Sequence, residues 1–180
     1  MNKEPGRMSV LDLKDRLLLT IFGSYDNDAK RKLSNLKKCL IQKGYSKCQL
    51  VSDYRFPKKR RDEDNDQYFR RKSIYWLENS DACIFVFLHG VNNDGVAFEL
   101  KHTCDHLESK LETCLVVIES KCSKYSTSLI RGTVTNLVKQ QKLNRRFFKN
   151  EPQLCKFCSS AAISFLKKRR FYLLNARALT

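Results

Sequence analysis

The chain has 180 residues, of which 42% are hydrophobic and 11% aromatic, so it can bury the core of one globular domain and is not a disordered polymer. Its formal net charge of +16 suits a phosphate-bearing ligand or a nucleic acid, although a basic host proteome would give the same charge without any function. No apolar run approaches the ~20 residues of a membrane helix, and residues 1–9 are polar without a secretory signal, so we expect a cytoplasmic protein with no membrane contact.

Apolar runs alternate with helical patterns after a polar arm at residues 1–14. The apolar runs predict strands at Arg16–Phe22, Lys47–Ser52, Ala82–Leu88, Leu111–Ile118 and Arg145–Phe148. The helical patterns predict helices at Asp28–Lys43, Gln67–Asn79 and Ser126–Leu143, and others that begin at Asp94 and at about Glu151. Helices between strands imply right-handed crossovers and a parallel sheet. We therefore expect an α/β three-layer sandwich, with a flavodoxin-like sheet of about five strands in the order 2-1-3-4-5.

The first predicted strand ends in Gly23-Ser24-Tyr25-Asp26. Glycine lets the backbone turn sharply and approach a ligand, and Ser24 with the following amides can hold a ribose or phosphate oxygen at a helix start. A plain strand-to-helix turn with Asp26 as the cap would explain the same residues.

Two basic clusters have alternative interpretations. Lys58–Arg61 is followed at once by the acidic run Asp62–Asp66, and such a loop is either simply solvated or grips a phosphate as a lid. Lys167–Arg170 lies at the end of the last predicted helix, where it can bind nucleic acid or be a solvated helix end with favourable charge.

The central apolar run is followed by a polar loop and by a helix that starts at Asp94-Gly95 and carries Glu99 in its second turn. Parallel strands end at one edge of the sheet, where open α/β folds bind ligands, so Asp94 and Glu99 are expected there. Asp94 can cap the helix. Glu99 shares a face with apolar residues, so burial would raise its pKa; an exposed helix acid is the alternative.

Two further carboxylates flank the central strands. Asp81 precedes the third strand, which places it at the opposite edge unless the strand begins later. Glu119 follows the fourth strand, on the same rim as Ser24 and Asp94. A carboxylate beside the anomeric carbon of a sugar can attack it or stabilise its positive charge, and this predicts chemistry of the glycoside-cleaving type.

Ser80–Phe87 together with Asn93–Leu100 resembles the signature of the nucleoside 2-deoxyribosyltransferase family, in which an Asp-Gly-x-x-x-Glu segment carries the nucleophilic glutamate. The resemblance covers about residues 16–165. It implies that Glu99 is the nucleophile on C1′, that Asp94 contacts the sugar hydroxyls, and that Asp81 matches the family's aspartate near the base by position only. The candidate binding residues are Gly23, Ser24, Tyr25, Asp26, Gly95 and Glu119.

The same resemblance divides the chain into an arm (1–14), a deoxyribosyltransferase-like domain (15–170) and a C-terminal tail (171–180). The family's pocket includes a partner subunit's C-terminus, which implies a homo-oligomer. The related deoxynucleoside monophosphate N-glycosidases hydrolyse the bond and grip a phosphate with serines and backbone amides. This chain departs from the family at Lys101-His102, where glycine and an aromatic residue are usual, and its tail has no carboxylate side chain.

A second resemblance is to TIR domains, some of which cleave the nicotinamide–ribose bond of NAD. It rests on Phe22–Asp28 and Phe98–Leu100. Both families imply that one glutamate breaks an N-glycosidic bond without a cofactor, in a nucleoside, nucleotide or NAD. The alternative is a binding module without catalysis, which senses nucleotides or binds nucleic acid through the basic C-terminal region.

Eight cysteines are scattered through the predicted elements, which indicates reduced thiols in a cytosol. Structural zinc needs four ligands, and Cys155-x-x-Cys158 is the only close pair. His102, Cys104 and His106 would complete a site only by an accident of tertiary structure, so we expect buried thiols and no metal.

Overall fold

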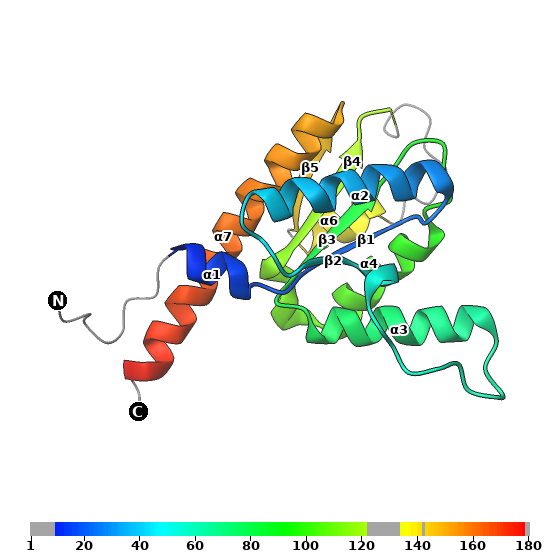
Figure 1. Ribbon diagram of the computed structural model, residues 1–180, viewed down its shortest axis with the longest axis horizontal. Coiled ribbons are helices and arrows are strands. Elements are labelled where there is room, and N and C mark those ends of the chain that lie inside the picture. Colours follow the sequence, from blue (N-terminus) through cyan, green and yellow to red (C-terminus); the bar gives the residue numbers. More distant parts are fainter. Residues whose placement is uncertain (1–9, 122–133, 142, 179–180) are drawn as a thin grey trace.

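Five strands form one parallel sheet in the computed structural model, which describes residues 10–121, 134–141 and 143–178 (Figure 1). The strands are β1 (Leu19–Gly23), β2 (Cys48–Leu50), β3 (Ala82–Phe87), β4 (Cys114–Glu119) and β5 (Asn144–Phe148). Their order is β2-β1-β3-β4-β5, and every neighbouring pair is parallel. The expected α/β, flavodoxin-like sheet with the order 2-1-3-4-5 is confirmed.

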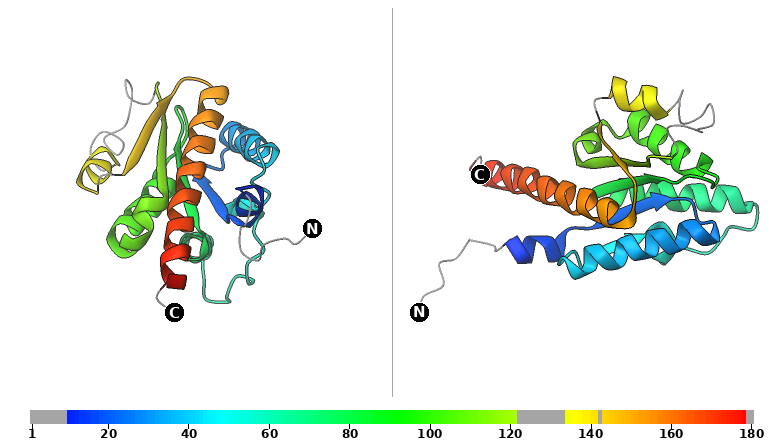
Figure 2. Two further views of the ribbon diagram at one scale, coloured as in Figure 1. Left: turned by 90° about the vertical axis from the view of Figure 1, so that its left-hand side faces the viewer. Right: turned by 90° about the horizontal axis from the view of Figure 1, so that it is seen from above.

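Helices form a layer on each face of the sheet. They are α1 (Val10–Arg16), α2 (Asn27–Gln42), α3 (Asn65–Asn79), α4 (Asp94–His106), α6 (Thr135–Gln140) and α7 (Glu151–Ala178), with the 3-10 helices η1 (Val51–Asp53) and η2 (Glu108–Thr113). One core cluster joins the sheet to α1, α2 and α7, and the other joins it to α3, α4 and α6. Figure 2 shows α2 on one side of the sheet, with α4 and α6 on the other. None of the described helices has an apolar segment long enough to cross a membrane.

The central strand β3 is covered on both faces. All of its residues are buried. Ile84 and Val86 pack in the cluster of α2 and α7, whereas Cys83 and Phe85 pack in the cluster on the opposite face. Because neither face meets water, the strand is apolar throughout rather than at alternate positions.

Strands β1 and β4 each begin three residues later than expected. The helix α1 extends to Arg16 because Leu13 and Leu17 turn into the core, so β1 starts only at Leu19. Residues 108–113 form η2, and β4 consequently starts at Cys114.

Parts of three expectations lie outside the described residues. Within the helix expected at 126–143, the structure describes α6, while residues 122–133 and 142 fall outside the description. The first nine residues of the expected arm also fall outside it. The segment expected as a tail continues α7 to Ala178, and the side chains of Arg169 and Arg170 in the basic C-terminal cluster are not among those described.

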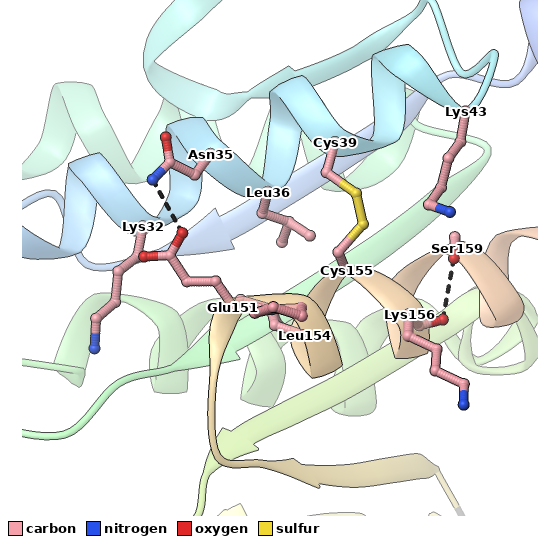
Figure 3. A pocket seen from close by; sticks show the side chains of 11 residues that line it. Lys32, Asn35, Leu36, Cys39, Lys43, Glu151, Leu154, Cys155, Lys156 and Ser159 are labelled. Atoms are coloured by element: carbon pink, nitrogen blue, oxygen red, sulfur yellow. Dashed lines mark hydrogen bonds between the residues drawn. A yellow bond between two sulfur atoms is a disulfide. The ribbon is translucent and has the colours of Figure 1, made fainter.

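A disulfide joins Cys39 of α2 to Cys155 of α7, with 6.3 Å between their Cα atoms (Figure 3). The expectation that all cysteines are reduced thiols is therefore wrong for this pair. The two residues are 116 positions apart, and only the packing of α2 against α7 brings them together. Among the described cysteines, the free thiols Cys48, Cys83, Cys104, Cys114 and Cys158 are buried.

Candidate functional site

A cavity of about 830 Å³ lies at the carboxyl edge of β1 and β3, enclosed by the turn after β1, by η1, by α3 and by the start of α4. The structure brings seven of the nine sequence-predicted site residues to its wall. They are Gly23, Ser24, Tyr25, Asp26, Asp94, Gly95 and Glu99. A smaller cavity of about 470 Å³ lies between α2 and α7 beside the disulfide, and none of the predicted residues lines it (Figure 3).

Glu99 faces this cavity from the second turn of α4 and is only 6% exposed. Burial raises the pKa of its carboxyl group to about 8, because the charged form loses its hydration. The hydroxyl of Ser73 donates a hydrogen bond to the carboxyl and opposes part of this shift. Such a carboxyl group binds its proton near neutral pH and is a reactive base once ionised.

Asn93 fixes the loop from which α4 starts. Its side-chain amide donates to the carbonyl groups of Leu88 (2.9 Å) and Val91 (3.1 Å), and its Oδ1 accepts from the Leu88 amide (3.1 Å). Asp94 is thus the first residue of α4 and not its cap, contrary to expectation, and its own amide donates to Asn92 Oδ1 at 2.7 Å. This loop leaves the Asp94 side chain exposed at the cavity wall.

The turn after β1 is tied to the loop after β3. The carboxylate of Asp26 accepts from the hydroxyl of Ser24 at 3.1 Å and from the amide of Asn92 at 3.3 Å. Gly23 allows close packing and does not adopt a backbone angle that only glycine favours. A Cβ at this position would lie 3.0 Å from Leu33 Cδ1 and 3.3 Å from the carbonyl oxygen of Val86. The turn is therefore held closely against both α2 and β3.

Tyr25 lines the same cavity. The residue is 38% exposed overall, yet its hydroxyl group lies in the interior, and burial is the main cause of its raised pKa. The charge of Glu99 raises the pKa further, while hydrogen bonding from the backbone at Ser52 and Val51 lowers it. Tyr25 therefore stays protonated and can donate a hydrogen bond beside Glu99.

The wall formed by α3 was not predicted. It contributes Ser73 and also Lys72, which is 7% exposed and whose Nζ lies 3.5 Å from the carbonyl oxygen of Ser52. Burial lowers the pKa of Lys72. The available signal was spacing: Ser73 lies four residues before the buried Leu77, on the same face of the helix.

The outer end of this wall is aromatic and basic. The guanidinium group of Arg70 lies over the ring of Phe98 at 4.5 Å and so links α3 to α4. Phe69 is 60% exposed at the edge of the cavity.

Two predicted site residues lie elsewhere. Asp81 is at the amino end of β3, the opposite edge of the sheet, where its Oδ2 accepts from the Leu18 amide at 2.8 Å. Glu119 forms an ion pair with Lys32 at 3.0 Å and accepts from the amide of His89 at 3.0 Å. Both carboxylates have structural partners, and neither lines the cavity.

The described residues contain no cluster of three or more His, Cys, Asp and Glu side chains arranged to hold a metal ion. The rings of His102 and His106 are 4.7 Å apart on the surface of α4, and Cys155 is engaged in the disulfide.

Comparison with known proteins supports the fold. The structure is similar to the crystal structure of a conserved protein from Enterococcus faecalis V583, with a TM-score of 0.51 and 13% sequence identity over 85% of this chain and 99% of the other. No protein-family model and no curated protein matches the sequence.

Proposed function

We propose that this protein is an enzyme that cleaves, or transfers across, the N-glycosidic bond of a nucleoside, nucleotide or NAD, with Glu99 acting at the anomeric carbon. The observation that carries the proposal is a 6% exposed carboxyl group on the wall of an 830 Å³ cavity. Ligand sites of about 300–1,000 Å³ are typical, so the space suits a nucleoside. A buried carboxyl group with a strongly raised pKa, here about 8, is characteristic of catalytic sites.

The pKa of about 8 defines how Glu99 would work. The ionised carboxylate is the form that attacks C1′ or stabilises positive charge there. As the C1′–N bond breaks, its electron pair leaves with the base and the sugar ring becomes positive. A carboxylate removed from water interacts strongly with that charge and only weakly with a neutral bound sugar, so it favours the transition state over the ground state.

Other side chains on the wall would position the sugar. Asp94 is exposed within the cavity and can accept hydrogen bonds from sugar hydroxyl groups. Ser24 is fixed by Asp26 on the turn opposite and offers a second hydroxyl for a polar substituent. The hydroxyl group of Ser73 can donate a hydrogen bond to the carboxyl group of Glu99.

The test is release of free base from deoxynucleosides, their monophosphates and NAD, resolved by chromatography. We expect Glu99→Gln to lower kcat/KM by about 10³-fold or more, as for removal of a nucleophile. Glu108→Gln, an exposed glutamate on η2, is the matched control and should retain activity. In the wild type, kcat/KM should rise with pH up to about 8, since the ionised Glu99 is required. Base release that is unchanged in Glu99→Gln would refute the mechanism.

A second candidate is a module that binds a nucleotide without reaction. It is favoured by three cationic side chains on the cavity wall, Lys30, Arg70 and Lys72. The departure from the family signature at Lys101-His102 does not add to this case, because Lys101 pairs with Asp105 on the surface and neither residue lines the cavity. Nucleotide binding by calorimetry, without any base release, would support this candidate.

A further inference from the structure

The connection between β2 and α3 carries unpaired positive charge. Lys58, Lys59, Arg60 and Arg61 are all exposed, and none forms a salt bridge within the described residues. Lys59 Nζ donates a hydrogen bond to Asn65 Oδ1 at 2.9 Å. Figure 1 shows the connection reaching outward to the N-terminal end of α3. This is the edge of the sheet at which α2 also begins.

The acidic residues that follow offset this cluster only in part, through Glu63, which accepts from the amide of Arg60 at 3.0 Å and whose pKa the charge of Arg60 helps to lower. Glu63 binds Arg71 through two hydrogen bonds of 2.7 Å, and this pairing holds the pKa of Glu63 at about 2. Asp64 caps α3 by accepting from the Gln67 amide at 2.7 Å. Residues 54–72 as a whole contain eight Lys and Arg against four Asp and Glu. The outward charge of this segment is therefore positive.

Exposed aromatic rings lie on α3, the helix that follows this connection. Phe69 is 60% exposed and Tyr75 is 44% exposed, both on α3. Phe56 lies between Tyr68 and Tyr75, with ring centroids 6.0 and 5.4 Å away, and Arg71 lies 4.8 Å above its ring. The rings are thereby fixed by packing while their outer faces meet solvent.

We infer that the β2–α3 connection and the neighbouring N-terminal half of α3 bind single-stranded nucleic acid. Phosphate groups would lie along Lys58–Arg61, and an unstacked base would stack on the exposed face of Phe69. A positive surface combined with free aromatic rings is the arrangement that single strands require, because each base offers a ring face that a duplex keeps stacked. A duplex would contact only the cationic side chains, because its bases stay stacked on one another.

This surface is continuous with the cavity, since Phe69 and Arg70 belong to both. A strand held on the surface passes the cavity mouth, where one nucleotide can turn inward toward Glu99. Binding of the strand does not depend on the activity proposed above. The further inference that the bound strand supplies the sugar on which Glu99 acts rests on that proposed activity.

Fluorescence anisotropy of labelled oligo-dT and oligo-U, each of about 12 nucleotides, tests the inference. We expect both to bind the protein, with an affinity that falls as salt rises. The triple variant Lys58→Gln, Arg60→Gln, Arg61→Gln should reduce the slope of log K against log salt by about 2, at about 0.7 for each lost phosphate contact.

The control has the same charge loss at exposed residues elsewhere, in the triple variant Lys38→Gln, Lys47→Gln, Lys149→Gln. This control should keep the wild-type slope. Equal weakening in the two triple variants would mean that the net charge of +16 binds any polyanion, and would overturn the inference.

Stacking is tested separately. Phe69→Ala should weaken strand binding roughly tenfold, and Phe69→Tyr should preserve it. A duplex of the same length should be insensitive to Phe69→Ala, whereas equal loss for duplex and single strand would refute stacking. Base release from free nucleosides is measured in parallel. If the wild-type protein releases base but does not bind the strands, this inference alone is overturned; if it binds the strands but releases no base, only the enzymatic proposal is overturned.

Discussion

Replacing Glu99 by glutamine should stabilise the folded protein, and the gain should grow with pH. The substitution removes the buried charge without changing the size of the side chain, and the glutamine carbonyl can still accept the hydrogen bond from Ser73. The carboxyl group has a pKa of about 8 in the folded protein and an ordinary value of 4.5. Between these two pH values the folded chain binds a proton that the unfolded chain has released.

This proton sets the direction in which stability changes with pH. Stability falls with rising pH wherever the folded state binds more protons than the unfolded state. Each pKa unit corresponds to about 1.4 kcal/mol, so the rise from 4.5 to about 8 amounts to about 5 kcal/mol, lost between these pH values. Between pH 5 and 8 the wild type should lose about 3–4 kcal/mol of stability that Glu99→Gln keeps.

Urea unfolding of both proteins at pH 5, 6, 7 and 8 measures this difference. All other titrating groups are shared, so their contributions cancel when one stability is subtracted from the other. Glu108→Gln, at an exposed site, should follow the wild type. Parallel curves for the wild type and Glu99→Gln would show that the carboxyl group is ordinarily hydrated, and the catalytic interpretation would lose its basis.

Three further predictions concern the frame of the cavity. Gly95→Ala should fold with unchanged or slightly higher stability by thermal unfolding, because a Cβ there has no atom within 4 Å, yet it should raise the KM or Kd of a nucleoside by narrowing the cavity. Gly23→Ala should lower the free energy of unfolding by about 1–3 kcal/mol, since its Cβ would lie 3.0 Å from a side chain of α2. Cys39→Ser with Cys155→Ser should cost about 5 kcal/mol for a bridge spanning 116 residues, and dithiothreitol should reduce wild-type stability to the same value; a reductant without effect would contradict the bridge.

The sheet could be predicted because its information is local. The residues of β3 are all buried, and their apolar run is legible without a structure. Helices between the runs then leave few possible topologies. The edges were less predictable: β2 is only three residues long, Cys48–Leu50, and the chain continues directly into η1. Whether the chain pairs or turns there depends on neighbours distant in sequence.

The residues of the site also divide into those that the sequence predicts and those that it does not. Ser24, Asp94 and Glu99 follow strand ends, and parallel strands place such residues at one edge by rule. Ser73 and Lys72 come from the middle of α3, a helix whose sequence pattern is ordinary. Only the packing of α3 against α4 brings Ser73 to Glu99 and both residues to the cavity wall. The disulfide was not predicted for the same reason, because its two cysteines come together only when α2 packs against α7.

The two sides of the cavity therefore have different parts in the proposed chemistry. The turn after β1 and the start of α4 present Ser24, Asp94 and Glu99, which suit a sugar and its breaking bond. The α3 wall presents cations and an exposed ring, which suit whatever phosphate or base the sugar carries. Burial raises the pKa of Glu99, the hydrogen bond from Ser73 opposes part of that rise, and no cation of α3 is among the causes of the shift. Under this proposal, changes in the cations of α3 can alter the substrate without altering the reactive group, so the class of bond cleaved and the identity of the substrate can be tested separately.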